Sequence, residues 1–102
     1  MKPLNLIRSQ LSSGEFSFSR HALKRVVERN ISETEIKQVG MNANIIEEYP
    51  EDKYSPSCLL LGFTQTGRPL HIQVSLADTN FVKIITLYEP DTAEWINYSQ
   101  RR

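Results

Sequence analysis

The chain of 102 residues has a single cysteine and no long apolar run. Its one cysteine, Cys58, cannot form an internal disulfide, and its place in the apolar run 58–61 indicates a small buried side chain rather than a nucleophile. The first residues do not resemble a signal peptide, and no apolar run approaches the ~20 residues that a membrane-spanning helix needs. We therefore expect a soluble, cytoplasmic protein.

Motifs for several kinds of chemistry are also missing. The only two histidines, His21 and His71, stand fifty residues apart without the spacing of metal ligands. The chain has no glycine-rich loop for phosphates and no Gly-x-Ser-x-Gly nucleophile elbow. We expect no metal ion and no cofactor, and any chemistry is expected to centre on these two histidines.

Charge is balanced in total but not along the chain. The formal net charge is zero, yet residues 1–30 hold six basic and two acidic side chains, and residues 31–60 hold two basic and six acidic ones. A local basic patch of this kind can bind a polyanion such as RNA. Solvated helix faces carry the same charges, and the sequence leaves both interpretations open.

The first part of the chain has apolar residues at helical spacing. Ser19 is a suitable N-cap for one helix, and Asn30 tolerates the left-handed conformation that ends it. Ser32 and Glu35 have the spacing of a capping box for the next helix. The sequence therefore predicts three helices, over about residues 4–13, 19–29 and 32–40.

The second part alternates with a period of two. This pattern predicts four strands, over about residues 45–49, 58–64, 70–76 and 81–88, and a short apolar bridge precedes the second helix at residues 16–18. Asp91 is expected to cap a short terminal helix that carries Trp95. The whole is predicted to be a single α+β domain, residues 1–102, with helices on one face of a roughly four-stranded antiparallel sheet.

One polar ridge lies on the second predicted helix. His21, Arg25 and Arg29 follow one another at i, i+4 and i+8, beside the apolar stripe of that helix. Such a ridge suits a bound anion, with the imidazole as a general base. A surface histidine beside two solvated arginines has the same pattern.

A second polar group lies on the predicted sheet. Alternation places His71 on the face opposite Ile72 and Val74. A register that pairs Ile72 with Leu87 and Val74 with Ile85 sets His71 opposite Tyr88, and Gln73 opposite Thr86. One face would then carry an imidazole, an amide, a hydroxyl and a phenol, although an ordinary wet sheet face carries such residues too.

Three blocks of the sequence, in order, resemble an uncharacterised bacterial family labelled as a domain of unknown function. The opening block is Phe18-Ser19-x-His21-Ala22-x-x-Arg25-x-x-x-Arg29-x-Ile31-Ser32. The later blocks are Arg68-Pro69-Leu70-His71-Ile72 and Ile85-Thr86-x-Tyr88-x-Pro90, followed by Trp95. The resemblance covers about residues 16–98. Asn30 stands where the family usually has glycine.

The family has been grouped with the barnase, EndoU and RelE-like ribonuclease folds, some of which are toxins of toxin–antitoxin pairs. The resemblance therefore implies a metal-independent endoribonuclease that acts on RNA, with an antitoxin or other small protein as a possible partner. The expected catalytic residues are His21 as base and His71 as acid, or the reverse, Arg25 and Arg29 on the phosphate, and Thr86 and Tyr88 as orienting or proton-transfer groups. The alternative is a non-catalytic module that binds RNA or a protein.

Overall fold

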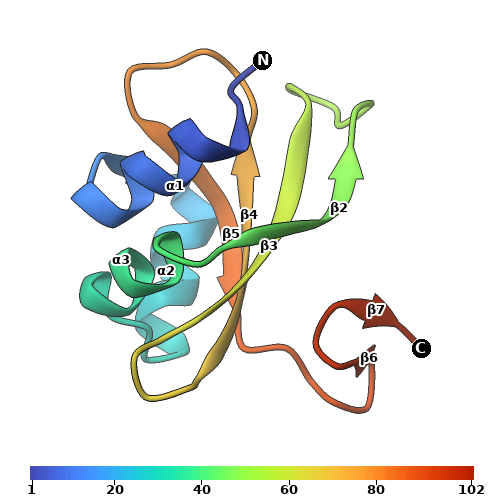
Figure 1. Ribbon diagram of the computed structural model, residues 1–102. Helices are drawn as coiled ribbons and strands as arrows, with labels where there is room; N and C mark the ends of the chain where they lie inside the picture. The colour runs from blue at the N-terminus through green and yellow to red at the C-terminus, as the bar shows by residue number, and fades with distance from the viewer.

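A computed structural model describes residues 1–102 and has three helices and seven strands (Figure 1). In chain order the elements are α1 (Leu4–Ser13), β1 (Phe16–Phe18), α2 (Arg20–Glu28), α3 (Glu33–Gly40), β2 (Asn44–Tyr49), β3 (Ser57–Phe63), β4 (Pro69–Ser75), β5 (Val82–Tyr88), β6 (Trp95–Ile96) and β7 (Gln100–Arg101). The prediction of an α+β structure with three helices before the main strands is confirmed.

The helix boundaries follow from side chains that the sequence displays. Ser19 accepts a hydrogen bond from the amide of Ala22, and Ser32 and Glu35 form a complete capping box. These contacts satisfy amide groups that the first turn of a helix leaves without a partner. Asn30, which follows α2, has a φ of 51°, so the left-handed residue predicted at this helix end is present.

The main sheet is mixed and five-stranded, in the order β1-β5-β4-β3-β2. The strands β2 to β5 are antiparallel to their neighbours, but β1 lies parallel to β5, with Phe16 beside Val82. The expectation of a four-stranded, wholly antiparallel sheet was therefore wrong. Three residues are too few to show alternation, and the apolar bridge at 16–18 becomes a strand only because the edge of β5 is free to pair with it.

The register between β4 and β5 agrees with the prediction at three pairs and differs at one. His71 lies opposite Tyr88, Ile72 opposite Leu87 and Gln73 opposite Thr86, but Val74 pairs with Ile84 rather than Ile85. The register shifts there, so Ile85 has no partner on β4 and forms a bulge. Ile84 takes the buried place that the sequence assigned to Ile85.

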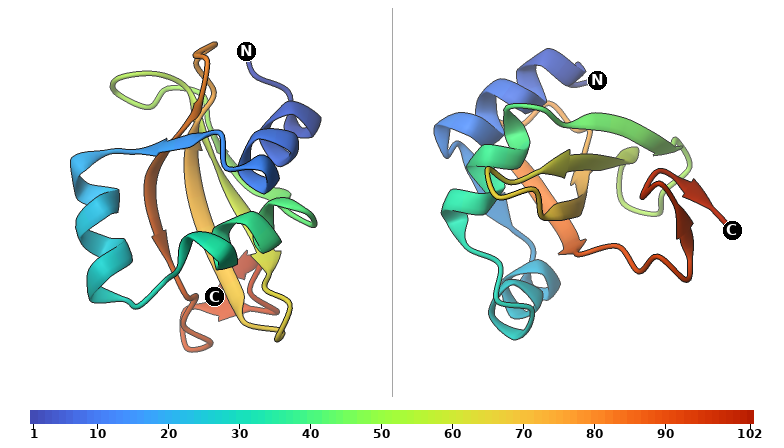
Figure 2. Two further views of the ribbon diagram at one scale, coloured as in Figure 1. Left: turned by 90° about the vertical axis from the view of Figure 1, so that its left-hand side faces the viewer. Right: turned by 60° about the horizontal axis from the view of Figure 1, so that its bottom comes forward.

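The C-terminal segment is not the predicted helix. Asp91 accepts a hydrogen bond from the amide of Ala93 and opens a turn, after which Trp95 and Arg101 pair across the small antiparallel ribbon β6–β7. This segment lies on one face of the sheet, and the three helices lie on the other (Figures 1 and 2). Trp95 is nearly fully buried because it packs on the sheet rather than on a helix.

The hydrophobic core lies between the helices and the sheet. Its members include Ile7 and Leu11 from α1, Ile36 from α3, and the inward side chains of β3, β4 and β5. Gly40 of α3 lies so close to α1 that an added Cβ would be 2.6 Å from the Cβ of Leu11. No helix has the length and apolar composition needed to cross a membrane.

Candidate functional site

The site begins with the way α2 is fixed to β5. The hydroxyl of Ser19 donates to the carbonyl of Ile85 (2.8 Å), while the same oxygen caps the first turn of α2. At the other end, Arg29 Nη1 donates to the carbonyl of Leu87 (2.7 Å). The helix that carries the predicted polar ridge is thus held against β5 at both ends. Figure 2 shows α2 standing apart from α1 and α3.

His71 lies on the face of β4 that turns away from the helices, and it is fully buried. Its ring meets the ring of Trp95 edge-on at 4.5 Å between centroids, and the ring of Tyr88 at 5.2 Å. Nε2 makes a short hydrogen bond with the backbone carbonyl of Tyr98, and Nδ1 lies 3.2 Å from the hydroxyl of Tyr88. Both ring nitrogens therefore have partners, and the C-terminal segment covers the imidazole.

These partners fix the tautomer of His71. A carbonyl oxygen only accepts, so Nε2 must carry the proton, and in a neutral ring Nδ1 is then the acceptor of the Tyr88 hydroxyl. Burial lowers the pKa of His71, against the opposing effects of the Tyr98 carbonyl and of Glu47. Burial also raises the pKa of Tyr88, so the phenol stays protonated at neutral pH. The result is an ordered chain of donors that runs from Tyr88 through His71 to Tyr98.

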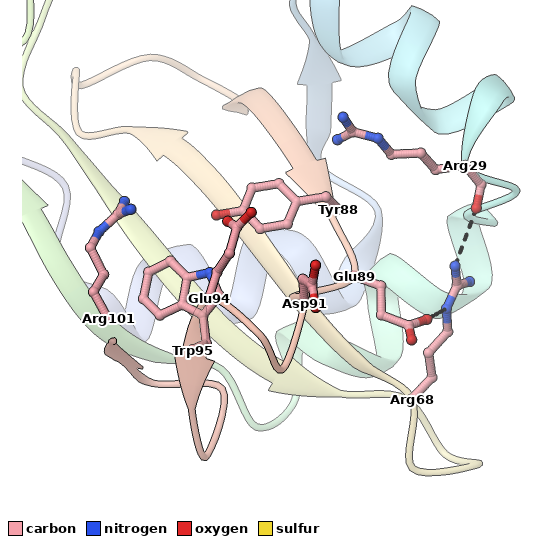
Figure 3. A pocket seen from close by; sticks show the side chains of 8 residues that line it. All are labelled: Arg29, Arg68, Tyr88, Glu89, Asp91, Glu94, Trp95 and Arg101. Atoms are coloured by element: carbon pink, nitrogen blue, oxygen red, sulfur yellow. Dashed lines mark hydrogen bonds and ion pairs between the residues drawn. The ribbon is translucent and has the colours of Figure 1, made fainter.

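Tyr88 opens onto a cavity of about 510 Å³, called here the Arg29 cavity (Figure 3). Side chains enter it from the end of α2, from the end of β5 and from the C-terminal segment. The lining residues are Arg29, Arg68, Tyr88, Glu89, Asp91, Glu94, Trp95 and Arg101. Three arginines and three acidic side chains therefore share one polar hollow beside the Tyr88–His71 pair.

Two of the three arginines are occupied by ion pairs. Arg68 binds Glu35 through Nη1 (3.0 Å) and Glu89 through Nε (2.8 Å). Arg101 binds Glu47 through Nε (2.8 Å), and its guanidinium lies 4.6 Å from the centre of the Trp95 ring. These pairs build the walls of the Arg29 cavity and offset the charge of both guanidiniums, although the Arg101 side chain stays 62% exposed.

Arg29 is the arginine that remains available. It makes no ion pair, and its single side-chain hydrogen bond uses one of the five N–H donors of a guanidinium. Its Cζ lies 5.8 Å from the centre of the Tyr88 ring. The cavity thus brings together one free guanidinium and one phenol whose proton is directed to a histidine.

The predicted site residues are not all gathered here. Arg29 and Tyr88 line the Arg29 cavity, and His71 lies directly behind Tyr88. His21 lines a different cavity, next to Ser75 and Ile85. Ser75, which lines that cavity with His21, lies roughly 13 Å along β4 from His71, so the two histidines belong to different cavities.

The other two predicted residues have intermediate places. Arg25 lies between His21 and Arg29 on α2, but its Nη1 is paired with Glu28 at 2.6 Å, and its buried Nε has no hydrogen-bond partner. Thr86 is half-buried opposite Gln73 and lines neither cavity. The ridge on α2 therefore exists, but its members face different neighbours.

Sequence reasoning missed most of the cavity wall. Asp91, Glu94, Trp95 and Arg101 come from a segment that was expected to be helical, so their approach to Tyr88 could not be foreseen. The pairing of Arg68 with Glu35 and Glu89 joins three parts of the chain and has no local signal. The described residues hold no group of three or more histidine, cysteine, aspartate or glutamate side chains arranged for a metal ion.

Comparison with known proteins gives one match. A protein-family model described as "Domain of unknown function (DUF4258)" matches residues 18–89, which run from the start of α2 to the end of β5. No curated protein and no solved structure shows significant similarity to the chain. The matched segment includes His21, Arg29, His71 and Tyr88 and covers well over half of the chain. The chain therefore belongs to the family of the domain of unknown function DUF4258.

Proposed function

We propose that the protein is a metal-independent endoribonuclease whose active site is the Arg29 cavity. The observation that carries the proposal is the hydrogen-bond chain from the Tyr88 hydroxyl through His71 to the Tyr98 carbonyl, with the free guanidinium of Arg29 beside it. A buried, oriented proton acceptor next to a phosphate-binding group is what cleavage of a phosphodiester requires. The grouping of the family with barnase, EndoU and RelE-like ribonuclease folds implies the same class of chemistry.

In the proposed reaction, the 2′-hydroxyl of a nucleotide gives its proton to the Tyr88 oxygen while Tyr88 passes its own proton to Nδ1 of His71. His71 then carries protons on both nitrogens, and Nε2–H stays bound to the Tyr98 carbonyl. The phenol has a raised pKa and could not act as base by itself, so the imidazole behind it accepts the proton. Tyr88 is the group that touches the substrate.

The 2′-oxygen forms a bond to phosphorus, and the bond from phosphorus to the 5′-oxygen breaks. Arg29 stabilises the negative charge that grows on the phosphoryl oxygens. The leaving 5′-oxygen takes a proton from water, and His71 returns its proton to solvent through Tyr88. The products are a 2′,3′-cyclic phosphate and a 5′-hydroxyl.

The acidic side chains of the cavity have a different part in this proposal. Asp91 and Glu94 make no ion pair and would repel a phosphate placed beside them. Carboxylates accept hydrogen bonds from the amino groups of bases and from hydroxyls. We place the sugar and base of the substrate against Asp91 and Glu94, and its phosphate against Arg29.

This assignment differs from a mechanism with two histidines. His71 becomes the proton acceptor and reaches substrate only through Tyr88, because its ring is buried and both nitrogens are bonded. His21 lies in another cavity and is not given a role in proton transfer. Arg25 and Thr86 are left without a direct contact to the reacting atoms.

The test is cleavage of single-stranded RNA in EDTA, with the ends of the products analysed for cyclic phosphate. Tyr88→Phe and Arg29→Ala should each lower kcat/KM by ~100-fold or more, in the range found for general acid–base and charge-stabilising groups. Lys24→Ala, an exposed change on α2 outside both cavities, is the matched control and should keep full activity. Cleavage that survives Tyr88→Phe and Arg29→Ala would contradict the proposal.

A second candidate, a module that binds a protein without catalysis, is favoured by one observation. Leu23 and Val27 lie one turn apart on α2 and are 54% and 76% exposed, which is unusual for two neighbouring apolar side chains on a basic helix. A small acidic partner, such as an antitoxin, fits such a face. This candidate predicts that wild type leaves RNA intact and that Leu23→Ser with Val27→Ser abolishes a stable complex with that partner.

A further inference from the structure

We propose that a second cavity, called here the His21 cavity, binds a backbone phosphate of the same RNA strand, about two to three nucleotides from the phosphate held by Arg29. The inference rests on the proposed function for the identity of its ligand. In this proposal His21 binds the substrate and takes no part in catalysis. The proposal also sets the shortest substrate that can occupy both cavities.

The His21 cavity has a volume of about 340 Å³ and lies where α2 begins, beside β4 and β5. Its lining residues are Ser19, His21, Tyr54, Ser55, Ser75, Lys83 and Ile85. Two of these side chains are basic and none is acidic, whereas the Arg29 cavity has three acidic side chains. With basic side chains and no acidic ones, the His21 cavity is better suited to bind an anion than the Arg29 cavity is.

The two basic groups are free to bind. His21 and Lys83 are exposed, and neither makes an ion pair or a side-chain hydrogen bond within the chain. A ligand would therefore displace no internal partner. The hydroxyls of Ser55 and Ser75, which also line this cavity, bond to each other at 2.8 Å and are available to a phosphate oxygen.

An aromatic side chain at the rim fits a nucleotide better than a simple anion. Tyr54 is 90% exposed and lines the His21 cavity, so one face of its ring is open. Stacking of bases on exposed aromatic rings is a common part of single-strand recognition and does not depend on sequence. Phosphate contacts from His21 and Lys83 with a stacked base on Tyr54 would make a subsite of one nucleotide.

The two cavities are at a spacing that a single strand can bridge. Ile85 lines one cavity and Tyr88 lines the other, three residues away on the same strand, which corresponds to about 10 Å. Stacked nucleotides rise about 3.4 Å each along the axis of the strand, and their phosphates lie farther apart than this because they wind around the axis, so two to three nucleotides span this distance. A dinucleotide can fill the Arg29 cavity but cannot reach His21.

The test measures binding without cleavage. Oligonucleotides of deoxyribose lack the attacking 2′-hydroxyl, so lengths of two, four and six nucleotides can be titrated against intact protein. We expect the imidazole signals of His21 to shift with four and six nucleotides and not with two. Because one phosphate contact is lost, His21→Ala with Lys83→Ala should flatten the slope of log K against log salt by about 0.7.

Kinetics then separate this inference from the proposed function. With an RNA of six nucleotides, the double variant should raise KM by ~10-fold and leave kcat unchanged, and with a dinucleotide neither value should change. Lys24→Ala removes one exposed cation outside the His21 cavity and should leave binding as in wild type. An unchanged salt slope in the double variant overturns the His21 subsite even if wild type cleaves RNA. A flattened slope without any cleavage supports the subsite and overturns the nuclease.

Discussion

The hydroxyl of Tyr88 lies 3.2 Å from Nδ1 of His71, directly across the β4–β5 ladder. The other ring nitrogen is bonded to the carbonyl of Tyr98, so Tyr88 is the one residue of the Arg29 cavity wall to which this buried histidine is hydrogen-bonded. His71 does not line the cavity itself, and this hydrogen bond connects it to Tyr88, which does. The proposed proton transfer depends on this contact, while the pH dependence of stability depends on the burial of His71.

Stability should fall in mildly acidic solution because of His71. Burial lowers the pKa of His71 in the folded protein below its ordinary value of 6.5. As pH falls through about 6.5, the unfolded chain binds a proton that the folded protein does not, so the free energy of unfolding decreases until the folded pKa is reached. Urea denaturation between pH 8 and pH 5 measures this loss.

The matched variants for the pH experiment are His71→Gln and His21→Ala. His71→Gln should lower stability at every pH and remove most of the slope between pH 7 and pH 5. His21→Ala removes the other imidazole, which is exposed, and is the control for loss of a histidine as such. A wild-type stability that is flat over this range would show that His71 takes up its proton in the folded state as easily as in the unfolded chain.

Trp95 should be among the residues that matter most for stability outside the main core. It is nearly fully buried, packs on His71, and lies under the guanidinium of Arg101. Replacing it with alanine should lower the free energy of unfolding by about 3–5 kcal/mol, as for other buried large aromatics. NMR titration should also show the pKa of His71 moving upward, because water then reaches the ring. Ile96→Ala, at the exposed next position, should cost much less.

The contribution of Arg68 to stability should depend on the shape of its guanidinium and not only on its positive charge. It binds Glu35 and Glu89, and it also donates to the carbonyls of Arg29 and Asn30 at the end of α2. Arg68→Ala should lower the free energy of unfolding by about 1–3 kcal/mol. Arg68→Lys should recover less than half of this loss, because an ammonium cannot make the forked contacts. Full recovery by lysine in thermal or urea melts would contradict this interpretation.

Gly40 should resist replacement by alanine although it lies in a helix. Alanine is favoured over glycine in helices by about 0.8–1.0 kcal/mol. At Gly40, however, a Cβ would lie 2.6 Å from the Cβ of Leu11 and 2.7 Å from the amide nitrogen of Ser12. The clash should dominate, and Gly40→Ala should destabilise the protein by about 1–3 kcal/mol.

Gly67 provides the comparison for Gly40. It has no atom within 4 Å of an added Cβ, but its φ is +89°. Gly67→Ala should therefore cost only the strain of a left-handed residue, about 1–2 kcal/mol. The two variants separate steric overlap from backbone strain. Gly67→Asn should cost less than Gly67→Ala in urea melts, because asparagine tolerates the left-handed conformation, whereas Gly40→Asn should cost at least as much as Gly40→Ala.

The sequence by itself determined the local structure. Helix starts at Ser19 and Ser32 and the end at Asn30 depend on contacts within one turn, so their residue types were sufficient. Strict alternation in β4 likewise set which face His71 occupies, and the apolar positions of β4 and β5 set the His71–Tyr88 pair. These features depend on neighbours in sequence or on a period that the residues display.

Only the tertiary structure decided where the functional groups meet. The bulge at Ile85, the parallel pairing of β1 and the packing of the C-terminal segment over His71 depend on contacts between distant parts of the chain. No local pattern encodes them, because each forms only when another element supplies a free edge or an apolar surface. For that reason the sequence identified both histidines as candidates, while the structure placed one behind Tyr88 and the other in a separate cavity.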